Sequence, residues 1–180
     1  EDSGAGSFDK AMELSRKFKL DVNKKWEKLS TGYRTIFKDI IGLASSREFV
    51  FFDEPILGLD ANHRELFYEE LLSAFSPDRC FVVATHLIEE IAPVIDSVII
   101  IDKGKVLKAE DKDSLLENIY MGSGDRSEVE EATKNCTSIS RTSIRGQEKV
   151  LVEGEVENEN VKKERVDLQR YFVEITKDGE

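Results

Sequence analysis

The sequence predicts an α/β fold with a parallel β-sheet, followed by a small α+β appendage at the carboxyl-terminal end. Three short apolar runs, at residues 49–52, 80–84 and 98–101, have the length of buried strands. Segments with apolar residues at helical spacing separate these runs, which gives the order strand, helix, strand, helix, strand. From about Gly122 the pattern changes to short β-prone segments rich in charge. We therefore expect helices on the faces of a parallel sheet before this point and a separate small structure after it.

Two acidic residues directly follow the first apolar run. Residues 49–52 are four bulky apolar residues in a row, which predicts a strand buried on both faces. Asp53 and Glu54 stand at its end, and burying carboxylates without partners costs several kcal/mol each. Pro55 has no N–H group and ends the strand. Because ligands of open α/β sheets lie beyond the carboxyl ends of the strands, we expect a cation or a polar ligand at these two acids.

The region before this strand predicts two helices. Residues 8–19 carry apolar side chains at helical spacing and predict an amphipathic helix. Ser30 is the expected N-cap of a second helix, whose apolar stripe covers residues 36–44. The free N–H groups of a helix N-terminus favour an anion. Residues 29–33 are therefore either a simple capped helix start or an anion-binding segment.

Further polar residues stand at the ends of later elements. Asp60 follows a turn at residues 57–60 and is either the N-cap of a helix over residues 66–75 or a functional acid. Thr85 and His86 end the second apolar run. A histidine at a strand end is either a half-buried structural side chain or a functional group, and the residue alone does not decide between the two.

The remaining elements are predicted from apolar spacing and turn residues. We expect a helix over residues 87–95, a hairpin turn at 102–105 with a return strand at 106–109, and a short helix over 112–120. Beyond these elements we expect a linker at 122–125, a short helix over 126–135, β-prone segments at 137–145 and 148–156, a charged stretch at 157–165 and a final helix from Leu168. Residues 125–180 form the α+β appendage, which contains no site that the sequence identifies.

Composition limits the possible partners and compartments. The chain has 180 residues, enough for one domain or one domain with a small appendage. Its net charge of −11 argues against a nucleic-acid partner, because neutralising phosphates needs a basic surface. No apolar stretch approaches the roughly 20 residues that span a bilayer, and no signal-peptide pattern opens the chain, so we expect a cytosolic protein. Cys80 and Cys136 form no metal-ligand pattern and are expected to be reduced.

Four short segments agree with one family in both identity and order. They are residues 29–33 (Leu-Ser-Thr-Gly-Tyr), 49–55 (Phe-Val-Phe-Phe-Asp-Glu-Pro), 57–61 (Leu-Gly-Leu-Asp-Ala) and 85–86 (Thr-His). With these segments the chain resembles the carboxyl-terminal part of the nucleotide-binding domain of ABC transporters. They correspond to its signature loop, Walker B strand, D-loop and switch histidine.

The resemblance covers residues 8–120 and implies a fold and a domain division. The fold is a P-loop NTPase-like parallel sheet with a helical signature subdomain, both partial. The expected parts are a signature subdomain (1–46), a Walker B, D-loop and H-loop half (47–121) and the appendage (122–180). The appendage more loosely resembles the carboxyl-terminal extension of bacterial transporters of the exporter-like subgroup.

The resemblance also implies roles at the end of the first strand. Asp53 would hold Mg²⁺, usually through water, which suits a hard oxygen ligand. Glu54 would orient and deprotonate the attacking water, and His86 would contact the γ-phosphate of ATP and that water. Phosphoryl transfer depends mainly on positioning and charge neutralisation, so such contacts are the expected machinery.

Four further residues are implied to act across a dimer interface. Ser30, Thr31 and Gly32 lie in the signature segment, which would contact the γ-phosphate of a nucleotide held by a second nucleotide-binding domain. Asp60 would cross the interface between the two subunits. The usual signature is Leu-Ser-Gly-Gly-Gln, and this chain has Thr31 and Tyr33 at the third and fifth positions.

The sequence contains no G-x-x-x-x-G-K-[ST] segment, which would cradle phosphates and supply a lysine. The Walker A half, the adenine-stacking aromatic residue and the Q-loop are therefore expected upstream of Glu1, and the chain is expected to be a fragment. Without that half, we expect it neither to bind ATP tightly nor to hydrolyse it.

The function implied by the resemblance is an ATP-binding and hydrolysing subunit that drives a transmembrane permease. Such a subunit is cytoplasmic, pairs with a second nucleotide-binding domain and lies at the inner face of the cell membrane. One alternative is a soluble ABC-type ATPase of translation or DNA repair, for which basic surfaces or a long coiled coil would be expected. Another is a non-catalytic helper that supplies only its signature loop, in which Glu54 and His86 would serve little purpose. The sequence does not name the transported substrate.

Overall fold

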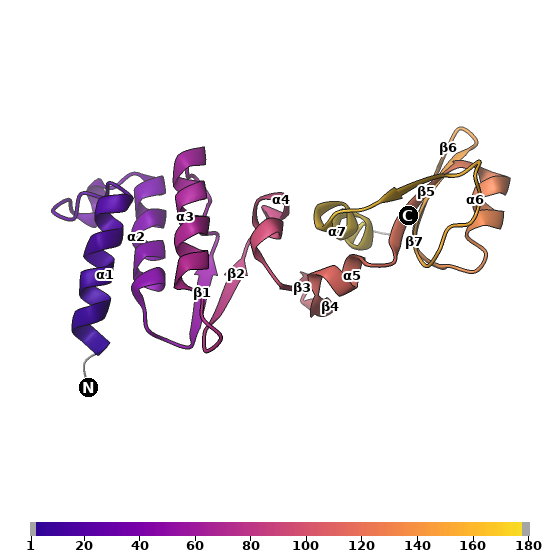
Figure 1. Cartoon of the computed structure of the whole chain (residues 1–180). Helices are drawn as coiled ribbons and strands as arrows, with labels where there is room; N and C mark the ends of the chain where they lie inside the picture. Colours follow the sequence, from indigo (N-terminus) through magenta and orange to yellow (C-terminus); the bar gives the residue numbers. More distant parts are fainter. Residues whose placement is uncertain (1–2, 178–180) are drawn as a thin grey trace. The chain divides into compact units, whose positions relative to one another are not determined.

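The computed structural model of the chain describes residues 3–177 and divides into two compact units (Figure 1). The first unit ends at Leu87 and the second begins at Ile88. The expected three-part division at residues 46/47 and 121/122 differs from this partition and stays a prediction. Residues 1, 2 and 178–180, at the outer ends of the first and third expected parts, lie outside the described residues.

The amino-terminal unit contains three long helices and two parallel strands. Strands β1 and β2 pair in parallel, with Phe49 opposite Cys80 and Asp53 opposite Ala84, as the strand–helix–strand pattern predicted. In chain order the elements are α1 (Ser3–Lys17), the 3₁₀ turn η1 (Trp26–Lys28), α2 (Thr31–Ala44), β1 (Phe49–Asp53), α3 (Ala61–Ala74) and β2 (Cys80–Ala84).

Side-chain caps fix the starts of α2 and α3. The Oγ atom of Ser30 accepts a hydrogen bond from the Tyr33 N–H group at 3.4 Å. The Oδ1 atom of Asp60 accepts one from the His63 N–H group at 3.0 Å. Each bond satisfies an N–H group that has no partner within the helix. The predicted N-caps of both helices are therefore confirmed.

The core of this unit lies between the helices and one face of β1. Phe52 packs edge-on against Phe67 of α3, with ring centroids 5.5 Å apart. Lys17 of α1 forms an ion pair with the buried Glu70 of α3. The buried core residues include Leu14, Phe18, Ile36, Ile40, Leu43, Val50, Phe52, Ile56, Phe67 and Leu71.

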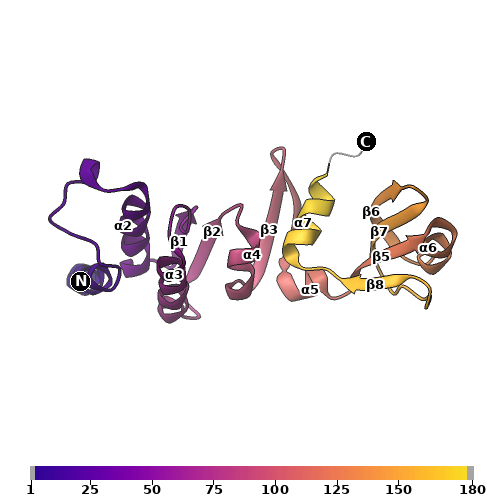
Figure 2. The same ribbon diagram turned by 90° about the horizontal axis from the view of Figure 1, so that it is seen from above.

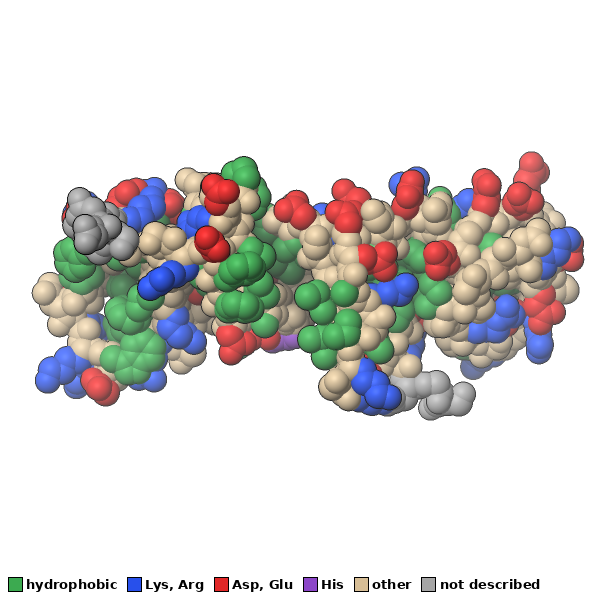
Figure 3. All heavy atoms as spheres, turned by 90° about the horizontal axis from the view of Figure 1, so that it is seen from below, with side chains coloured by type: hydrophobic (Ala, Val, Ile, Leu, Met, Phe, Trp, Pro, Cys, Tyr) green, Lys and Arg blue, Asp and Glu red, His purple; other side chains and the backbone are tan. Residues whose placement is uncertain are grey.

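The other face of β1 is exposed, so the prediction of a strand buried on both faces is wrong. Val50 and Phe52 are buried, whereas Phe49 and Phe51 are 63% and 74% exposed. Alternate residues of a strand point to opposite sides, so Val50 and Phe52 share one face and Phe49 and Phe51 share the other. Side chains of α2 and α3 cover the face of Val50 and Phe52. Figure 3 shows hydrophobic side chains gathered at the surface over this part of the chain.

The carboxyl-terminal unit begins with short helical turns and a β-hairpin. The predicted helix over residues 87–95 is a short helix followed by a 3₁₀ turn, and the predicted return strand is longer than expected. The elements are α4 (Ile88–Ile91), η2 (Ala92–Val94), β3 (Ser97–Asp102), β4 (Lys105–Asp111) and α5 (Lys112–Leu116).

Strand β3 does not extend the parallel sheet, which corrects the prediction of a third parallel strand. It pairs with β4 in an antiparallel two-stranded sheet. The two residues between these strands, Lys103 and Gly104, have φ angles of 47° and 76°. Positive φ at both central residues is the geometry of a tight hairpin turn, and such a turn forces antiparallel pairing.

A four-stranded antiparallel sheet forms the rest of this unit (Figure 2). Its strand order is β6-β7-β5-β8, with α6 and α7 on opposite faces. The predicted short helix, paired β segments and final helix are confirmed in type. The elements are β5 (Ile119–Asp125), α6 (Arg126–Ala132), β6 (Thr137–Ile144), β7 (Gln147–Glu153), β8 (Lys162–Arg165) and α7 (Leu168–Thr176).

The predicted linker at residues 122–125 is wrong, because these residues lie in β5 between β7 and β8. A Cβ atom at Gly122 would lie 3.5 Å from Val150 Cγ1 and 3.6 Å from Val161 Cγ1. These are ordinary van der Waals distances, so Gly122 occupies a packed position in a strand rather than a flexible linker. The same strand starts at Ile119 and so shortens the helix predicted over 112–120. Part of the charged stretch at 157–165 forms β8.

No helix within residues 3–177 has the length and apolar character needed to cross a membrane. Both cysteines are free thiols.

We expect Gly42→Ala to destabilise the amino-terminal unit by about 1–2 kcal/mol. Overpacking of a core costs about 1–3 kcal/mol. The better helix propensity of alanine offsets up to about 1 kcal/mol of that cost. A Cβ atom at Gly42 would lie 2.5 Å from Cε1 of the buried Phe52 ring. Urea unfolding measures the effect. In a Phe52→Leu background the cost should shrink, and an equal cost in both backgrounds would contradict this contact.

We also expect the chain to self-associate in solution through the exposed face of β1, because large apolar side chains on an uncovered sheet favour association. Sedimentation velocity should show concentration-dependent oligomers that Phe51→Ser reduces. Phe75→Ser is the matched control, since Phe75 is 56% exposed at the end of α3 rather than on β1. A monodisperse wild-type monomer would count against this expectation.

Candidate functional site

Glu54 occupies an unusual backbone conformation at the carboxyl end of β1. Its φ angle is 49°, in the left-handed region that non-glycine residues rarely adopt. Its N–H group donates to the carbonyl oxygen of Ala84 at 2.8 Å, which extends the pairing of β1 with β2 by one residue. Lys19, Lys103 and Arg145 share this conformation, so the φ angle by itself does not mark a site. At Glu54 it coincides with the carboxyl end of β1, and strained residues cluster at functional sites.

The Glu54 carboxylate forms hydrogen bonds with the two residues that follow β2. Its Oε2 atom accepts a hydrogen bond from Thr85 Oγ1 at 2.8 Å. Its Oε1 atom accepts from the His86 N–H group at 3.2 Å and lies 2.6 Å from His86 Nδ1. The Glu54 side chain is 29% exposed and that of His86 is 65% exposed. The structure therefore brings Glu54 and His86 together at a solvent-exposed site. Thr85 also binds Glu54 there, although the sequence analysis gave Thr85 no separate role.

These contacts determine the charge on Glu54. Burial acts to raise the pKa of Glu54, but hydrogen bonds from His86 and then Thr85 outweigh it and leave the pKa below the usual value of 4.5. Glu54 is therefore a carboxylate at neutral pH. A carboxylate only accepts hydrogen bonds, so the Nδ1 atom of His86 carries the proton in this pair.

Asp53 lies exposed beside this cluster, as the last residue of β1. Within residues 3–177 no group of three or more His, Cys, Asp or Glu side chains is arranged to hold a metal by itself. Mg²⁺ at nucleotide sites keeps several waters and takes one or two carboxylates together with phosphate oxygens. Asp53 fits the role of such a single carboxylate, since its side chain is open to solvent.

The signature segment packs against the turn that precedes α3. A Cβ atom at Gly32 would lie 2.8 Å from the carbonyl oxygen of Gly58, so only glycine fits there without a shift of the backbone. Gly58 itself has a φ angle of 79°. Thr35 Oγ1 lies 3.3 Å from the Thr31 carbonyl oxygen and 3.4 Å from that of Leu57, and it contacts both segments. Residues 30–32 and 57–60 thus form a second cluster, with Ser30 and Thr31 exposed.

His63 is a residue of this second cluster that the sequence analysis missed. Its Nδ1 atom lies 2.8 Å from Asp60 Oδ2, and its ring centroid lies 6.1 Å from that of Tyr33 and 6.3 Å from that of Phe18. The pKa of Asp60 is lowered, first by the His63 N–H group and then by the His63 ring. The spacing of a histidine three residues after an N-cap aspartate was the available signal. Asp60 therefore serves as a helix cap and is directed to His63.

The predicted site residues thus fall into two clusters within the amino-terminal unit. Glu54 and His86 meet at the ends of β1 and β2 with Asp53 beside them, and Ser30, Thr31 and Gly32 meet the Asp60 turn.

A solved structure shares this fold. The structure described as the ATP-binding subunit of an ABC transporter matches with a TM-score of 0.58 and 20% sequence identity, over 63% of this chain and 48% of that one. The class of fold is therefore that of the ABC ATPases, a branch of the P-loop NTPases, as the sequence predicted.

The curated relatives that match part of the chain are named as ATP-binding proteins of transporters. Energy-coupling factor transporter ATP-binding protein EcfA2 of Mycoplasmoides gallisepticum is 37% identical over 65 residues, which are 36% of this chain and 20% of that protein. ABC transporter ATP-binding protein NatA of Bacillus subtilis is 28% identical over 108 residues, which are 59% of this chain and 44% of that protein. No family model matches the chain. Part of this chain therefore matches the nucleotide-binding domain of ABC transporters, and the chain spans less than half the length of these relatives.

We expect His86→Ala to raise the pKa of Glu54, because the variant loses the ring contact while burial still disfavours the carboxylate. The folded-state pKa of Glu54 in the wild type lies below 4.5, so its ionised form stabilises the fold above that pH, and this contribution is lost as the pH falls through the folded pKa. The acid-dependent part of the unfolding free energy should shrink in the variant.

Carboxyl ¹³C chemical shifts of Glu54 measured across a pH titration test this expectation directly. His63→Ala is the matched control, since the ring of His63 pairs with Asp60 rather than with Glu54. If the pKa of Glu54 is the same in His86→Ala and the wild type, the hydrogen bond between the two side chains does not hold the carboxylate.

Proposed function

We propose that this chain is part of an ATP-binding and hydrolysing subunit of an ABC transporter, which drives a substrate across a membrane through a partner permease. The observation that carries the proposal is the hydrogen-bonded pair of Glu54 and His86 at the carboxyl ends of two parallel strands, with Asp53 exposed beside it. Ligands of α/β sheets bind at this edge. The ATP-binding relatives support the same conclusion.

In this proposal Glu54 positions and activates the attacking water. Its carboxylate is ionised at neutral pH and can accept a proton from water, although its lowered pKa makes it a weak base in this state. Because Nδ1 of His86 is turned to Glu54, the Nε2 atom of its exposed ring is the one left to face a γ-phosphate, to which it donates a hydrogen bond only when the ring carries a proton on both nitrogens. Asp53 would take part in holding Mg²⁺, which neutralises phosphate charge when bound.

Ser30, Thr31 and Gly32 are proposed to contact the γ-phosphate of a nucleotide held by a second nucleotide-binding domain. They stand at the N-terminus of α2, where free N–H groups and the helix dipole favour an anion. The close contact of Gly32 with Gly58 couples this segment to the turn of Asp60. A nucleotide bound there would therefore act on both segments, which is consistent with the proposed role of Asp60 at the interface between two subunits.

The proposal places the protein in the cytoplasm, at the inner face of the membrane beside its permease. It also requires a phosphate-binding segment from outside these 180 residues, since their sequence contains no G-x-x-x-x-G-K-[ST] motif. The chain alone is therefore proposed to be inactive. Steady phosphate release from ATP and Mg²⁺ by the purified chain would contradict this part of the proposal.

A chimera tests the proposed roles. Residues 8–120 replace the matching part of the Bacillus subtilis NatA protein, whose own remaining sequence supplies the rest of the ATPase. We expect ATP hydrolysis by the chimera and a loss of about 10²–10⁴-fold in turnover with Glu54→Gln, the usual contribution of a positioned base. His86→Ala should also lower turnover, with ATP binding retained in both variants.

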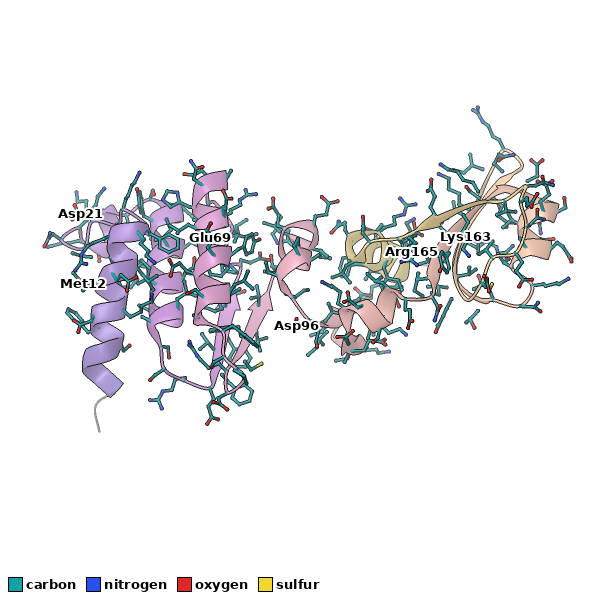
Figure 4. The ribbon with its side chains drawn as sticks, in the orientation of Figure 1. Met12, Asp21, Glu69, Asp96, Lys163 and Arg165 are labelled. Carbon is teal, nitrogen blue, oxygen red and sulfur yellow. The ribbon has the colours of Figure 1, made fainter. Side chains whose placement is uncertain are left out.

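Glu69→Gln is the matched control for this experiment, because Glu69 is an exposed glutamate on α3 outside both clusters (Figure 4). Circular dichroism and ATP binding confirm that each chimera is folded. A folded chimera in which Glu54→Gln turns over as fast as Glu69→Gln would refute the catalytic role of Glu54.

A further inference from the structure

A pocket with converging cations lies on the four-stranded sheet of the carboxyl-terminal unit. Its volume is about 300 Å³, at the lower end of the range of small-molecule sites. Its walls come from β5, β7, β8 and the start of α7, all within one compact unit. The lining residues are Met121, Ser123, Lys149, Lys162, Glu164, Arg165, Val166, Asp167 and Arg170.

The strand register explains why these side chains share one face. Ser123 of β5 lies opposite Lys149 of β7 on one side and opposite Lys162 of β8 on the other. Directly paired residues of an antiparallel sheet point to the same face, so the hydroxyl and the two ammonium groups form one row across three strands. In the next row Met121 is buried and lies opposite Glu164. The pocket therefore has an apolar floor beside a basic row.

Lys162, Lys149 and Arg170 all lie close enough to Glu164 to affect its pKa. The pKa of Glu164 is lowered first by its hydrogen bond with Lys162, and Lys149 and Arg170 also lower it. Three cations thus act on one carboxylate. Asp167 also lines the pocket, and its Oδ1 atom caps α7 by accepting from the Arg170 N–H group at 2.7 Å. The Arg170 guanidinium forms an ion pair with Glu174 at 3.0 Å, so Lys149 and Lys162 are the cations that lie in the row with Ser123. Arg165 pairs with Tyr120 and so alternates to the other face. The lining residues that remain include three basic side chains, of Lys149, Lys162 and Arg170, and two acidic ones, an excess of one positive charge within a chain of net charge −11.

We propose that this pocket binds a small soluble molecule carrying a phosphate group, such as a phosphate monoester. A phosphate carries a charge of about −1.5 to −2 at pH 7, which is opposite in sign to the row formed by Lys149 and Lys162 beside Ser123. Lys149 and Lys162 donate to the phosphate oxygens, Ser123 supplies a hydroxyl, and Met121 contacts the apolar part of the ligand. The site is independent of the proposed ATP site, since all of its residues lie in the carboxyl-terminal unit.

The sheet also supplies a matched control. Lys163 is next to Lys162 on β8 but pairs with Gly122, and its Nζ atom lies 4.0 Å from the centroid of the Tyr120 ring (Figure 4). Alternation along the strand places it on the face opposite the pocket. Lys149→Ala and Lys163→Ala each remove one positive charge from the same sheet, but Lys149→Ala alone removes one from the pocket.

Amide NMR of the 180-residue chain, titrated with inorganic phosphate and with glycerol phosphate at constant ionic strength, tests the proposal. We expect saturable shifts at Ser123, Lys149 and Lys162. Lys149→Ala should weaken binding by about tenfold or more, as expected for the loss of one charge-assisted hydrogen bond, whereas Lys163→Ala should leave it unchanged. Lys162→Ala is the second variant if Lys149→Ala loses its native spectrum.

Three outcomes would overturn the proposal. The first is the absence of localised shifts at millimolar phosphate. The second is equal weakening by Lys149→Ala and Lys163→Ala, which would indicate general charge screening. The third is a response to vesicles containing phosphatidic acid without a response to either soluble phosphate, which would assign the pocket to a membrane surface.

Discussion

The hydrogen bonds accepted by the Glu54 carboxylate are the constraint on which the amino-terminal site depends. Parallel strands are joined by long crossovers rather than by tight turns, so α3 separates β1 from β2 in the sequence. The chain connection alone does not hold Thr85 and His86, which follow β2, next to Glu54, which follows β1. Their hydrogen bonds to the Glu54 carboxylate hold them there. The left-handed φ angle of Glu54, which costs about 1–3 kcal/mol, persists because the surrounding contacts compensate for it.

Close packing of two glycines holds together the two segments of the second cluster. A side chain at residue 32 would meet the Gly58 carbonyl oxygen, so the close packing of the signature segment on the Asp60 turn requires glycine there. The departures from the usual signature are compatible with this packing. Thr31 is exposed, and Tyr33 packs near the ring of His63, which Asp60 holds. The substituted positions thus face the core or the solvent, while Ser30 and Gly32 keep the cap and the close contact.

Local signals in the sequence were sufficient where a single residue determines the structure. Ser30 and Asp60 cap helices because of their own side chains, and the apolar runs form β1 and β2 because of their own composition. Predictions failed where distant residues decide. Gly122 resembles a linker residue until Val150 and Val161 are known to flank it, and Phe49 resembles a buried residue until the cover of its face is known. The contact of Glu54 with Thr85 and His86 joins residues about 30 positions apart. The family resemblance implied only that Glu54 and His86 act at one site, and the hydrogen bonds themselves, including that of Thr85, were not predicted.

The exposed face of β1 and the proposed ATPase function each require a further segment of protein. Phe49 and Phe51 leave a large apolar area in water, and burial of such area is the main source of stability in folded proteins. The proposed ATP hydrolysis at Glu54 requires a G-x-x-x-x-G-K-[ST] segment, and the sequence of these 180 residues contains none. A segment that packed on this sheet could satisfy both demands, because it would cover the aromatic side chains and bring phosphates to the edge where Asp53, Glu54 and His86 stand. The same contact would then stabilise the fold and complete the site, so that folding and nucleotide binding would be linked in one event.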